Sequence, residues 1–379
     1  MAKKKKKKKV NAKKTAKIGI TMGRIDQVWT NGLHQNTVIL AKILKQIGYD
    51  VYLIVEDKGD LGNEFHGIKL AKFGAGQSKN MASYNFDIVL YVSFSISPKN
   101  MEVVRKTGCK QVIVEYGNLF QIFNETAIGK GDEKFSVDSE KYNSADALWA
   151  SPHFERNAPW YKSFTDVTFD ICPYVWNPMF FDAKCKELGG DPQWNPQKDT
   201  RTIAIHEPNI NVIKTCVIPL SIVGILNKRR PELIKKCYSL NTKHLKDIKP
   251  FEDYIHSIGL VKKGSFDERR TTPFMVCSGV TGTSVFHHTN NSLNYLPLEM
   301  MNLGYPVVHN SDDFKSAGYF YNEIDSVEGA NQLEIAISTH EENYDKKLEE
   351  SKELIWKYST DNPDNVQGYK DLIEKLLDN

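Results

Sequence analysis

The sequence predicts an α/β protein built from two Rossmann-like halves, and two observations support this prediction. The first is an alternation of short apolar runs with helical patterns, which indicates strands at Ile18–Thr21, Val51–Val55, Phe86–Val92, Gln111–Tyr116 and Ala147–Ala150. The second is that a similar alternation begins again near residue 202, after a stretch rich in proline and glycine. We therefore expect a parallel sheet with helices on both faces in each half.

Length and composition agree with two globular domains. The chain has 379 residues, of which 40% are hydrophobic and 26% are charged. We expect a lysine-rich tail at 1–16, a first domain at 17–175, a linker at 176–200, a second domain at 201–358 and a terminal helix within 359–379.

Several kinds of site and location are disfavoured. The longest apolar run, Cys216–Leu226, is interrupted by Pro219 and is too short to span a bilayer, and no apolar segment of a signal peptide follows the first lysines. The six cysteines lack metal-binding spacing, so free thiols and a cytoplasmic location are expected. Asp312 and Asp313 are adjacent rather than alternating, so no D-x-D metal site is expected.

The charge is concentrated at the N-terminus. Lys3–Lys9, Lys13, Lys14 and Lys17 precede every acidic residue, and because the whole chain carries +3, the remainder carries −7. Such a run is expected to be a disordered arm that contacts polyanions, either nucleic acid or an anionic membrane. The alternative is a solubilising tail without a specific partner.

The first loop is a candidate ligand site, because it follows a strand at the carboxyl edge of the predicted sheet. A helix is expected to begin at Asn31 and Gly32, where the glycine would allow a ligand to approach the backbone. His34 and Gln35 could line the same cleft, although a structural role for the histidine stays open. Asp26 in this loop is a candidate general base.

Two later strand ends in the first half also carry polar residues. Tyr116 and Asn118 follow one expected strand. Ser151–Phe154 follows Ala147–Ala150, which we expect to be the last strand of this half, so His153 would face an acceptor. A structural role for His153 is the alternative.

The second half contains a lysine in an unusual position. A strand at Thr202–His206 is followed by the loop Glu207–Asn209 and by an apolar helix expected from about Val212 to Leu226. Lys214 would then lie in the first turn, where a cation is unfavourable unless an anionic ligand such as a diphosphate is bound. A solvated surface lysine is the alternative.

A second helix start follows near residue 294. Asn294 can cap a helix that has Pro297 in its first turn and Gly304 at its end, and a buried strand is expected at Tyr305–His309. The helix N-terminus would attract a phosphate, and Glu299 could accept hydrogen bonds from a ribose. Glu299 could equally serve only to complement the helix dipole.

The segments around this helix complete the second half. We expect strands at Pro273–Cys277 and Ser284–His287, and helices at Asn331–Tyr358 and Tyr369–Leu377. His287 and His288 lack a third ligand with suitable spacing, so a zinc site is not expected.

Two family resemblances are visible. Glu299 and the run from Gly304 to Val308 resemble the donor-site signature of retaining family 4 glycosyltransferases of the GT-B fold, with Asn291 in place of the first glutamate of that signature. The chain is more closely similar to an uncharacterised GT-B-like family, a domain of unknown function. The shared motifs are W-x-N-G-x-x-Q-N from residue 29, S-P-H-F from 151, V-W-x-P from 175, E-P-N from 207 and L-N-Y-L from 293.

The resemblance implies a GT-B fold in which two Rossmann-like domains face each other across a cleft and the terminal helix packs back on the first domain. It places the nucleotide-sugar donor, most simply a UDP-sugar, on the second domain and the acceptor on the first. The candidate donor-binding residues are Glu299, Asn291, Asn294, Leu293, Tyr295, Gly32, Asn31, Asn209 and Glu207. The candidate acceptor-binding residues are His34, Gln35, Tyr116 and Asn118. The candidate catalytic residues are Lys214, His153 and Asp26.

The function expected from the resemblance is metal-independent glycosyl transfer, by a hexosyl- or pentosyltransferase with retention of configuration. An inverting enzyme would use Asp26, His34 or His153 as general base. The acceptor would be a glycan or, given the lysine arm, a hydroxymethylated DNA base of the kind that phage glycosyltransferases modify. The alternatives are a non-catalytic nucleotide- or nucleic-acid-binding protein and an epimerase or phosphorylase of the same fold.

Overall fold

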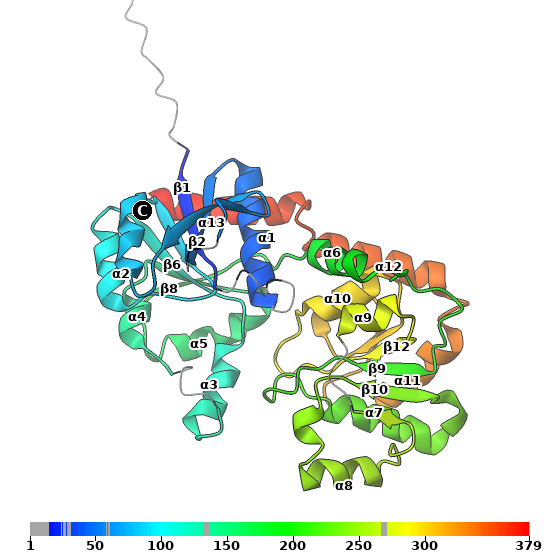
Figure 1. Cartoon of the computed structure of the whole chain (residues 1–379). Coiled ribbons are helices and arrows are strands. Elements are labelled where there is room, and N and C mark those ends of the chain that lie inside the picture. Colours follow the sequence, from blue (N-terminus) through cyan, green and yellow to red (C-terminus); the bar gives the residue numbers. More distant parts are fainter. Residues whose placement is uncertain are drawn as a thin grey trace, which may run out of the picture.

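The protein folds into two α/β domains, each with a central sheet of mainly parallel strands (Figure 1). The structure is a computed structural model and describes residues 15–23, 25, 28, 32–57, 59, 61–131, 136–266 and 271–378. The predicted α/β class with two Rossmann-like domains is confirmed. Asp26, Asn31 and the expected arm at Lys3–Lys14 lie outside the described residues.

The first sheet has the strand order β3-β4-β2-β1-β5-β6-β7-β8, and the only antiparallel pair among the described strands is β3 with β4. Apolar residues fill its centre, since all four residues of β5 and of β7 are buried. The strands are β1 (Lys17–Thr21), β2 (Asp50–Glu56), β3 (Glu64–Phe65), β4 (Ile68–Phe73), β5 (Ile88–Tyr91), β6 (Lys110–Glu115), β7 (Ala147–Ala150) and β8 (Thr168–Ile171).

The helices of this domain begin and end at the residues that favour such positions. Helix α2 is capped by Ser97 and has proline in its first turn, and Gly48, with φ of +109°, follows the end of α1. The helices are α1 (Gly32–Ile47), α2 (Pro98–Arg105), α3 (Leu119–Ala127), α4 (Ser139–Asn143) and α5 (Ala158–Tyr161), with 3₁₀ turns η2 (Ser78–Tyr84) and η4 (Pro152–Asn157).

The second sheet is parallel throughout its described pairs, in the order β11-β10-β9-β12-β13-β14. Its strands are β9 (Thr202–Ile205), β10 (Lys236–Ser239), β11 (Gly264–Ser265), β12 (Thr283–Val285), β13 (Val307–His309) and β14 (Tyr319–Phe320). Its helices are α6 (Met179–Leu188), α7 (Val217–Arg229), α8 (Lys249–Ser257), α9 (Thr272–Cys277), α10 (Tyr295–Asn302) and α11 (Ser326–Thr339), with 3₁₀ turns η5 (Pro231–Leu233), η6 (Lys243–Leu245) and η7 (Asp312–Phe314).

The last two helices connect the domains. Helix α12 (Tyr344–Tyr358) lies against α10 in the second domain, and α13 (Pro363–Asp378) lies against α1 in the first (Figure 1). The hydroxyl of Tyr369 in α13 donates to the carbonyl of Pro173 (2.6 Å), and the N–H of Trp176 donates to the carbonyl of Tyr358 (2.7 Å). The two segments that pass between the domains, one after β8 and one between α12 and α13, are therefore both held by hydrogen bonds.

Three sequence predictions about elements are wrong. Residues 273–277 form helix α9 rather than a strand, because Pro273 fits the first turn of a helix but would interrupt a strand ladder. The first sheet continues past β7 to β8, so Ser151 does not follow its last strand. Helix α7 begins at Val217 rather than Val212, which leaves Lys214 in the preceding loop.

Candidate functional site

A cavity of about 390 Å³ lies between the two domains, at the carboxyl ends of the central strands. The first domain contributes the start of α1, including Gly32, and the residues that follow β6, including Tyr116. The second domain contributes Lys214 and the loop that enters α10, with Asn291, Leu293, Asn294 and Tyr295. This is the edge of an open α/β sheet at which ligands bind, so we call it the cleft.

Lys214 is half-buried in the cleft. It lies on a loop that is stabilised by the side chain of Asn209. Asn209 adopts a left-handed φ of +56°, donates from Nδ2 to the carbonyls of Glu207 (2.9 Å) and Leu240 (3.0 Å), and accepts at Oδ1 from the N–H of Cys216 (2.7 Å). These bonds use the side chain of Asn209 within the loop. Its visible role is therefore to position the segment that presents Lys214.

The ammonium of Lys214 is a cation that has no ion-pair partner within the described part of the chain. Among the described residues it forms neither a hydrogen bond nor an ion pair. Burial lowers its pKa, and the nearby carboxylate of Glu207 acts in the opposite direction. A half-buried cation of this kind is costly without an anion, so it favours an anionic ligand in the cleft.

Glu207 is itself occupied by contacts within the second domain. It is 1% exposed, its Oε1 accepts from the N–H of His287 (3.1 Å), and its Oε2 lies 3.6 Å from Nε2 of His288. Nε2 of His288 also lies 3.2 Å from Nδ2 of Asn294. Glu207 thus joins the loop after β9 to the loop after β12.

Helix α10 points its N-terminus into the cleft, with Asn294 as the predicted cap. Oδ1 of Asn294 accepts from the N–H of Leu296 (3.2 Å), and Pro297 has no N–H. Of the first three residues of the helix, only Tyr295 therefore keeps a backbone N–H that the cap does not occupy. The positive end of the helix dipole remains available to an anion.

The tip of this loop makes contacts across the domain boundary. Nε2 of His153 donates to Oδ1 of Asn291 (3.2 Å), and Nδ2 of Asn118 donates to the carbonyl of Asn290 (2.6 Å). Asn118 also caps α3, since its Oδ1 accepts from the N–H of Gln121 (3.0 Å). His153 and Asn118 therefore hold the loop from the second domain against the first.

The protonation state of His153 limits its chemistry. Burial is the main cause that lowers the pKa of this imidazole to about 3, and the hydrogen bond to Asn291 only partly offsets it. The ring is thus neutral at physiological pH with its proton on Nε2. Because an efficient general base has a pKa near the working pH, His153 is a poor candidate for that role.

Tyr116 and Tyr295 line the cleft with hydroxyl groups that other residues already hold. The hydroxyl of Tyr116 lies 2.9 Å from that of Tyr369 in α13. The hydroxyl of Tyr295 lies within hydrogen-bond distance of the carbonyl of Val175 (2.7 Å) and of Oδ1 of Asn36, and its single proton can be donated to one of them at a time. The approach to Asn36 is a third contact between the domains. Asn36 also lines the cleft, and it was not among the predicted site residues.

Glu299 lies on α10 but is not among the residues that line the cleft. Its side chain is buried, and among the described residues its carboxyl group has no hydrogen-bond partner. Burial, followed by repulsion from Asp182, raises its pKa to about 8. The contact of Glu299 with a ribose therefore remains a prediction, and the lining of the cleft does not support it.

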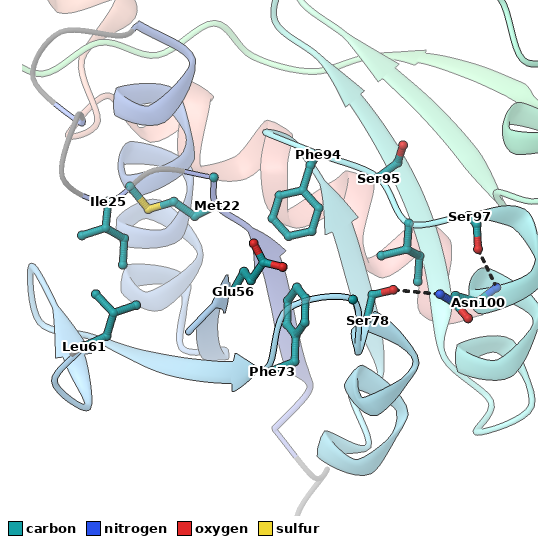
Figure 2. A pocket seen from close by; sticks show the side chains of 13 residues that line it. Met22, Ile25, Glu56, Leu61, Phe73, Ser78, Phe94, Ser95, Ser97 and Asn100 are labelled. Atoms are coloured by element: carbon teal, nitrogen blue, oxygen red, sulfur yellow. Dashed lines mark hydrogen bonds between the residues drawn. The ribbon is translucent and has the colours of Figure 1, made fainter. Parts of the chain in front are cut away.

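His34 and Gln35 are buried in the first turn of α1, beside the cleft but not in its lining. A Cβ atom added at Gly23 would lie 3.1 Å from Nε2 of His34. Gly23 in turn lines a second cavity, of about 740 Å³, that lies wholly in the first domain (Figure 2). None of the site residues predicted from the sequence lines this cavity.

A third cavity, of about 830 Å³, adjoins the cleft at Asn291. His153 and Arg156 line it from the first domain, and His288 and Asp313 line it from the second. In the part of the chain that the structure describes, no three histidine, cysteine or acidic side chains are placed to hold a metal ion. Within the same part, no helix is both long and apolar enough to cross a membrane.

Two facing Rossmann-like domains with a cleft at their carboxyl edges define the GT-B fold, and solved structures agree with this assignment. The chain belongs to the family described as protein of unknown function (DUF2827), which it matches over residues 18–373. No curated protein matches the sequence.

Three solved structures illustrate the similarity of fold. A glycosyltransferase from Rickettsia africae is 12% identical with a TM-score of 0.58, over 97% of this chain and 100% of that one. The α,α-trehalose 6-phosphate synthase from Burkholderia multivorans is 9% identical with a TM-score of 0.61, over 96% and 98%. HepE from Anabaena, in complex with UDP-glucose, is 12% identical with a TM-score of 0.58, over 95% and 99%.

Proposed function

We propose that the protein is a glycosyltransferase that moves a sugar from a nucleoside-diphosphate sugar to an acceptor hydroxyl. The observation behind the proposal is the ammonium of Lys214, which has no partner among the residues that the structure describes and shares the cleft with the N-terminus of α10. A diphosphate is the ligand that both features favour. UDP is the first nucleotide to test, because the structurally similar HepE was solved with UDP-glucose.

In this proposal the protein acts mainly on the leaving group. As the bond between the sugar and the diphosphate breaks, negative charge develops on the diphosphate, and Lys214 with the dipole of α10 stabilises it. Asn291, which lines the cleft and is held by His153, would contact the transferred sugar. We propose retention of configuration, with the leaving phosphate taking the proton of the acceptor hydroxyl, because His153 is too weak a base for an inverting reaction.

The test is release of UDP from UDP-sugars by the purified full-length chain, with and without added saccharides. We expect slow release without acceptor, faster release with a suitable acceptor, and a reduction of both by about 10- to 100-fold in Lys214→Ala. A protein that binds UDP but releases none from any UDP-sugar would instead be a non-catalytic nucleotide-binding member of the fold.

The lysine arm leaves DNA as a second candidate acceptor. Lys3–Lys9 could hold a polyanion beside an otherwise acidic protein. Lys17, however, belongs to β1, and its ammonium donates to the carbonyl of Tyr84 (2.7 Å), so it is not part of a free arm. Sugar transfer to duplex that contains 5-hydroxymethylcytosine would support this alternative.

A further inference from the structure

The cavity of the first domain has the dimensions of a small-molecule site. It lies at the carboxyl ends of β1, β2, β4 and β5, and its volume of about 740 Å³ is in the range that encloses a small ligand. Figure 2 shows the carboxylate of Glu56 pointing into the space near the rings of Phe73 and Phe94. The cavity therefore combines an apolar wall with one acidic group.

The apolar wall is a pair of aromatic rings. Phe73, the last residue of β4, and Phe94, just after β5, have ring centroids 6.2 Å apart at an interplanar angle of 55°. Phe73 is buried, and Phe94 is partly exposed to the cavity. The negative face of such rings attracts the C–H groups of a saccharide ring.

The acidic group is free to bind a ligand. Glu56, at the end of β2, is exposed, and among the described residues its carboxylate has no hydrogen bond or ion pair. It is also the one charged side chain among the described residues of the lining. Lys72, next to Phe73 in sequence, pairs instead with Asp57 (3.4 Å). A carboxylate accepts hydrogen bonds from hydroxyl or ammonium groups and repels phosphate.

Another part of the lining is polar, and its side chains are hydrogen-bonded to one another. Nδ2 of Asn100 donates to Oγ of Ser78 (2.8 Å), and the N–H of Asn100 donates to Oγ of Ser97 (3.4 Å), as Figure 2 shows. Oδ1 of Asn100 has no partner among the described residues. Hydroxyl and amide groups held in this way can form hydrogen bonds with the hydroxyl groups of a ligand.

The cavity and the cleft lie near opposite sides of the first turn of α1, and no described residue lines both. Gly23 lines the cavity, and its position is in contact range of His34 on α1, whose neighbours Gly32 and Asn36 line the cleft. Transfer would therefore require the acceptor hydroxyl to reach past Gly23 and His34 to the donor in the cleft.

We infer that this cavity is the acceptor site, and that the acceptor is a saccharide that carries hydroxyl or amino groups but no phosphate. The inference rests on the proposed glycosyl transfer and adds the chemical class of the acceptor. Phe94 would stack against the sugar ring, and Glu56 would accept hydrogen bonds from its hydroxyl or ammonium groups.

The test is saturation-transfer NMR on the full-length protein with methyl glycosides of glucose, galactose, mannose and glucosamine, and with glucose 6-phosphate. We expect at least one methyl glycoside to bind and glucose 6-phosphate not to bind. Phe94→Ala and Glu56→Gln should each weaken that binding about tenfold. Glu64→Gln, on exposed β3 outside the cavity, is the matched control and should bind as the parent does.

The outcomes separate this inference from the proposed function. Glycoside binding that depends on Phe94 and Glu56 supports the site even if UDP fails to bind, a result that would overturn only the donor proposal. If UDP binds but no methyl glycoside does, or if glycoside binding is unchanged in both variants, the acceptor assignment is wrong. Melting temperatures of the variants, measured beside the parent, identify any loss that comes from unfolding.

Discussion

The cleft between the domains and the cavity of the first domain differ in charge and in construction. The cleft is built from both domains and contains the cation of Lys214, whereas the cavity belongs to one domain and contains the carboxylate of Glu56. Neither group is paired with another residue that the structure describes. Hydrogen bonds within the protein occupy many polar groups around the cleft, including those of Asn118 and Tyr295. We propose that the contrast reflects two different ligands, an anionic donor in the cleft and a non-anionic acceptor in the cavity.

The largest effect should come from removing the cation of the cleft. Lys214→Ala is expected to lower the kcat/KM for the UDP-sugar by about 10- to 100-fold, because a hydrogen bond to a charged group contributes roughly 1.5–3 kcal/mol. Steady-state UDP release measures this effect. Lys246→Ala, an exposed lysine outside the cleft, is the matched control, and an equal loss in both variants would contradict the role of Lys214.

The next effect concerns stability rather than catalysis. Burial raises the pKa of Glu299 from 4.5 to about 8, so the folded protein retains this proton over a pH range in which the unfolded chain loses it. The contribution of Glu299 to the free energy of unfolding is therefore fully present below pH 4.5 and is lost as the pH rises through 8.

Glu299→Gln should remove this dependence. We expect the variant to gain stability relative to the parent by about 2–4 kcal/mol between pH 5 and pH 9. Urea denaturation at both pH values measures the difference. If the two proteins keep a constant difference across this range, the carboxyl group is ionised in the folded state and is open to a ligand such as ribose.

A smaller effect is expected at His153. His153→Gln can still donate a hydrogen bond to Asn291, so turnover should fall by less than about threefold, whereas loss of a general base typically costs about 100-fold or more. The pH profile of kcat/KM should show no ionisation of His153 between pH 5 and 8, because its pKa is about 3. A loss of 100-fold in this variant would restore an inverting mechanism with His153 as base.

The smallest effect on either site should come from the arm. Deletion of residues 1–16 should leave the affinity for UDP within about twofold, since Lys17 and β1 remain. Binding to duplex DNA, followed by fluorescence anisotropy, should weaken and become less dependent on salt. Intact protein without salt-dependent affinity for DNA would show that the arm does not serve a nucleic acid.

The sequence predicted the parts of the site that depend on local order. The cap at Asn294, the end of α10 at Gly304 and the placement of Asn291 and Lys214 beside one cleft follow from strand, loop and helix succession. The start of α7 was missed, because a periodic pattern cannot show that the side chain of Asn209 takes the N–H of Cys216 and keeps the chain out of the helix.

Features that depend on the folded chain were beyond the sequence. A motif gives the position of Glu299 in α10 but not the direction of its side chain, which is buried away from the cleft lining. Strand β4 has only six residues, IKLAKF, in which the lysines do not alternate regularly with apolar residues, and it was overlooked. Phe73 was therefore not placed beside Glu56, its partner in the sheet register. Contacts such as that of Asn36 with Tyr295 join residues that only the docking of the two domains brings together.

The central claim, that the two sites take different ligands, is tested most directly by calorimetric titration of UDP into three proteins. These are the parent, Lys214→Ala and Phe94→Ala, all with the full-length chain. The account predicts that UDP binds the parent, binds Lys214→Ala at least about tenfold more weakly, and binds Phe94→Ala with the affinity of the parent. Equal affinity of UDP for the parent and Lys214→Ala, or a comparable loss in Phe94→Ala, would contradict it.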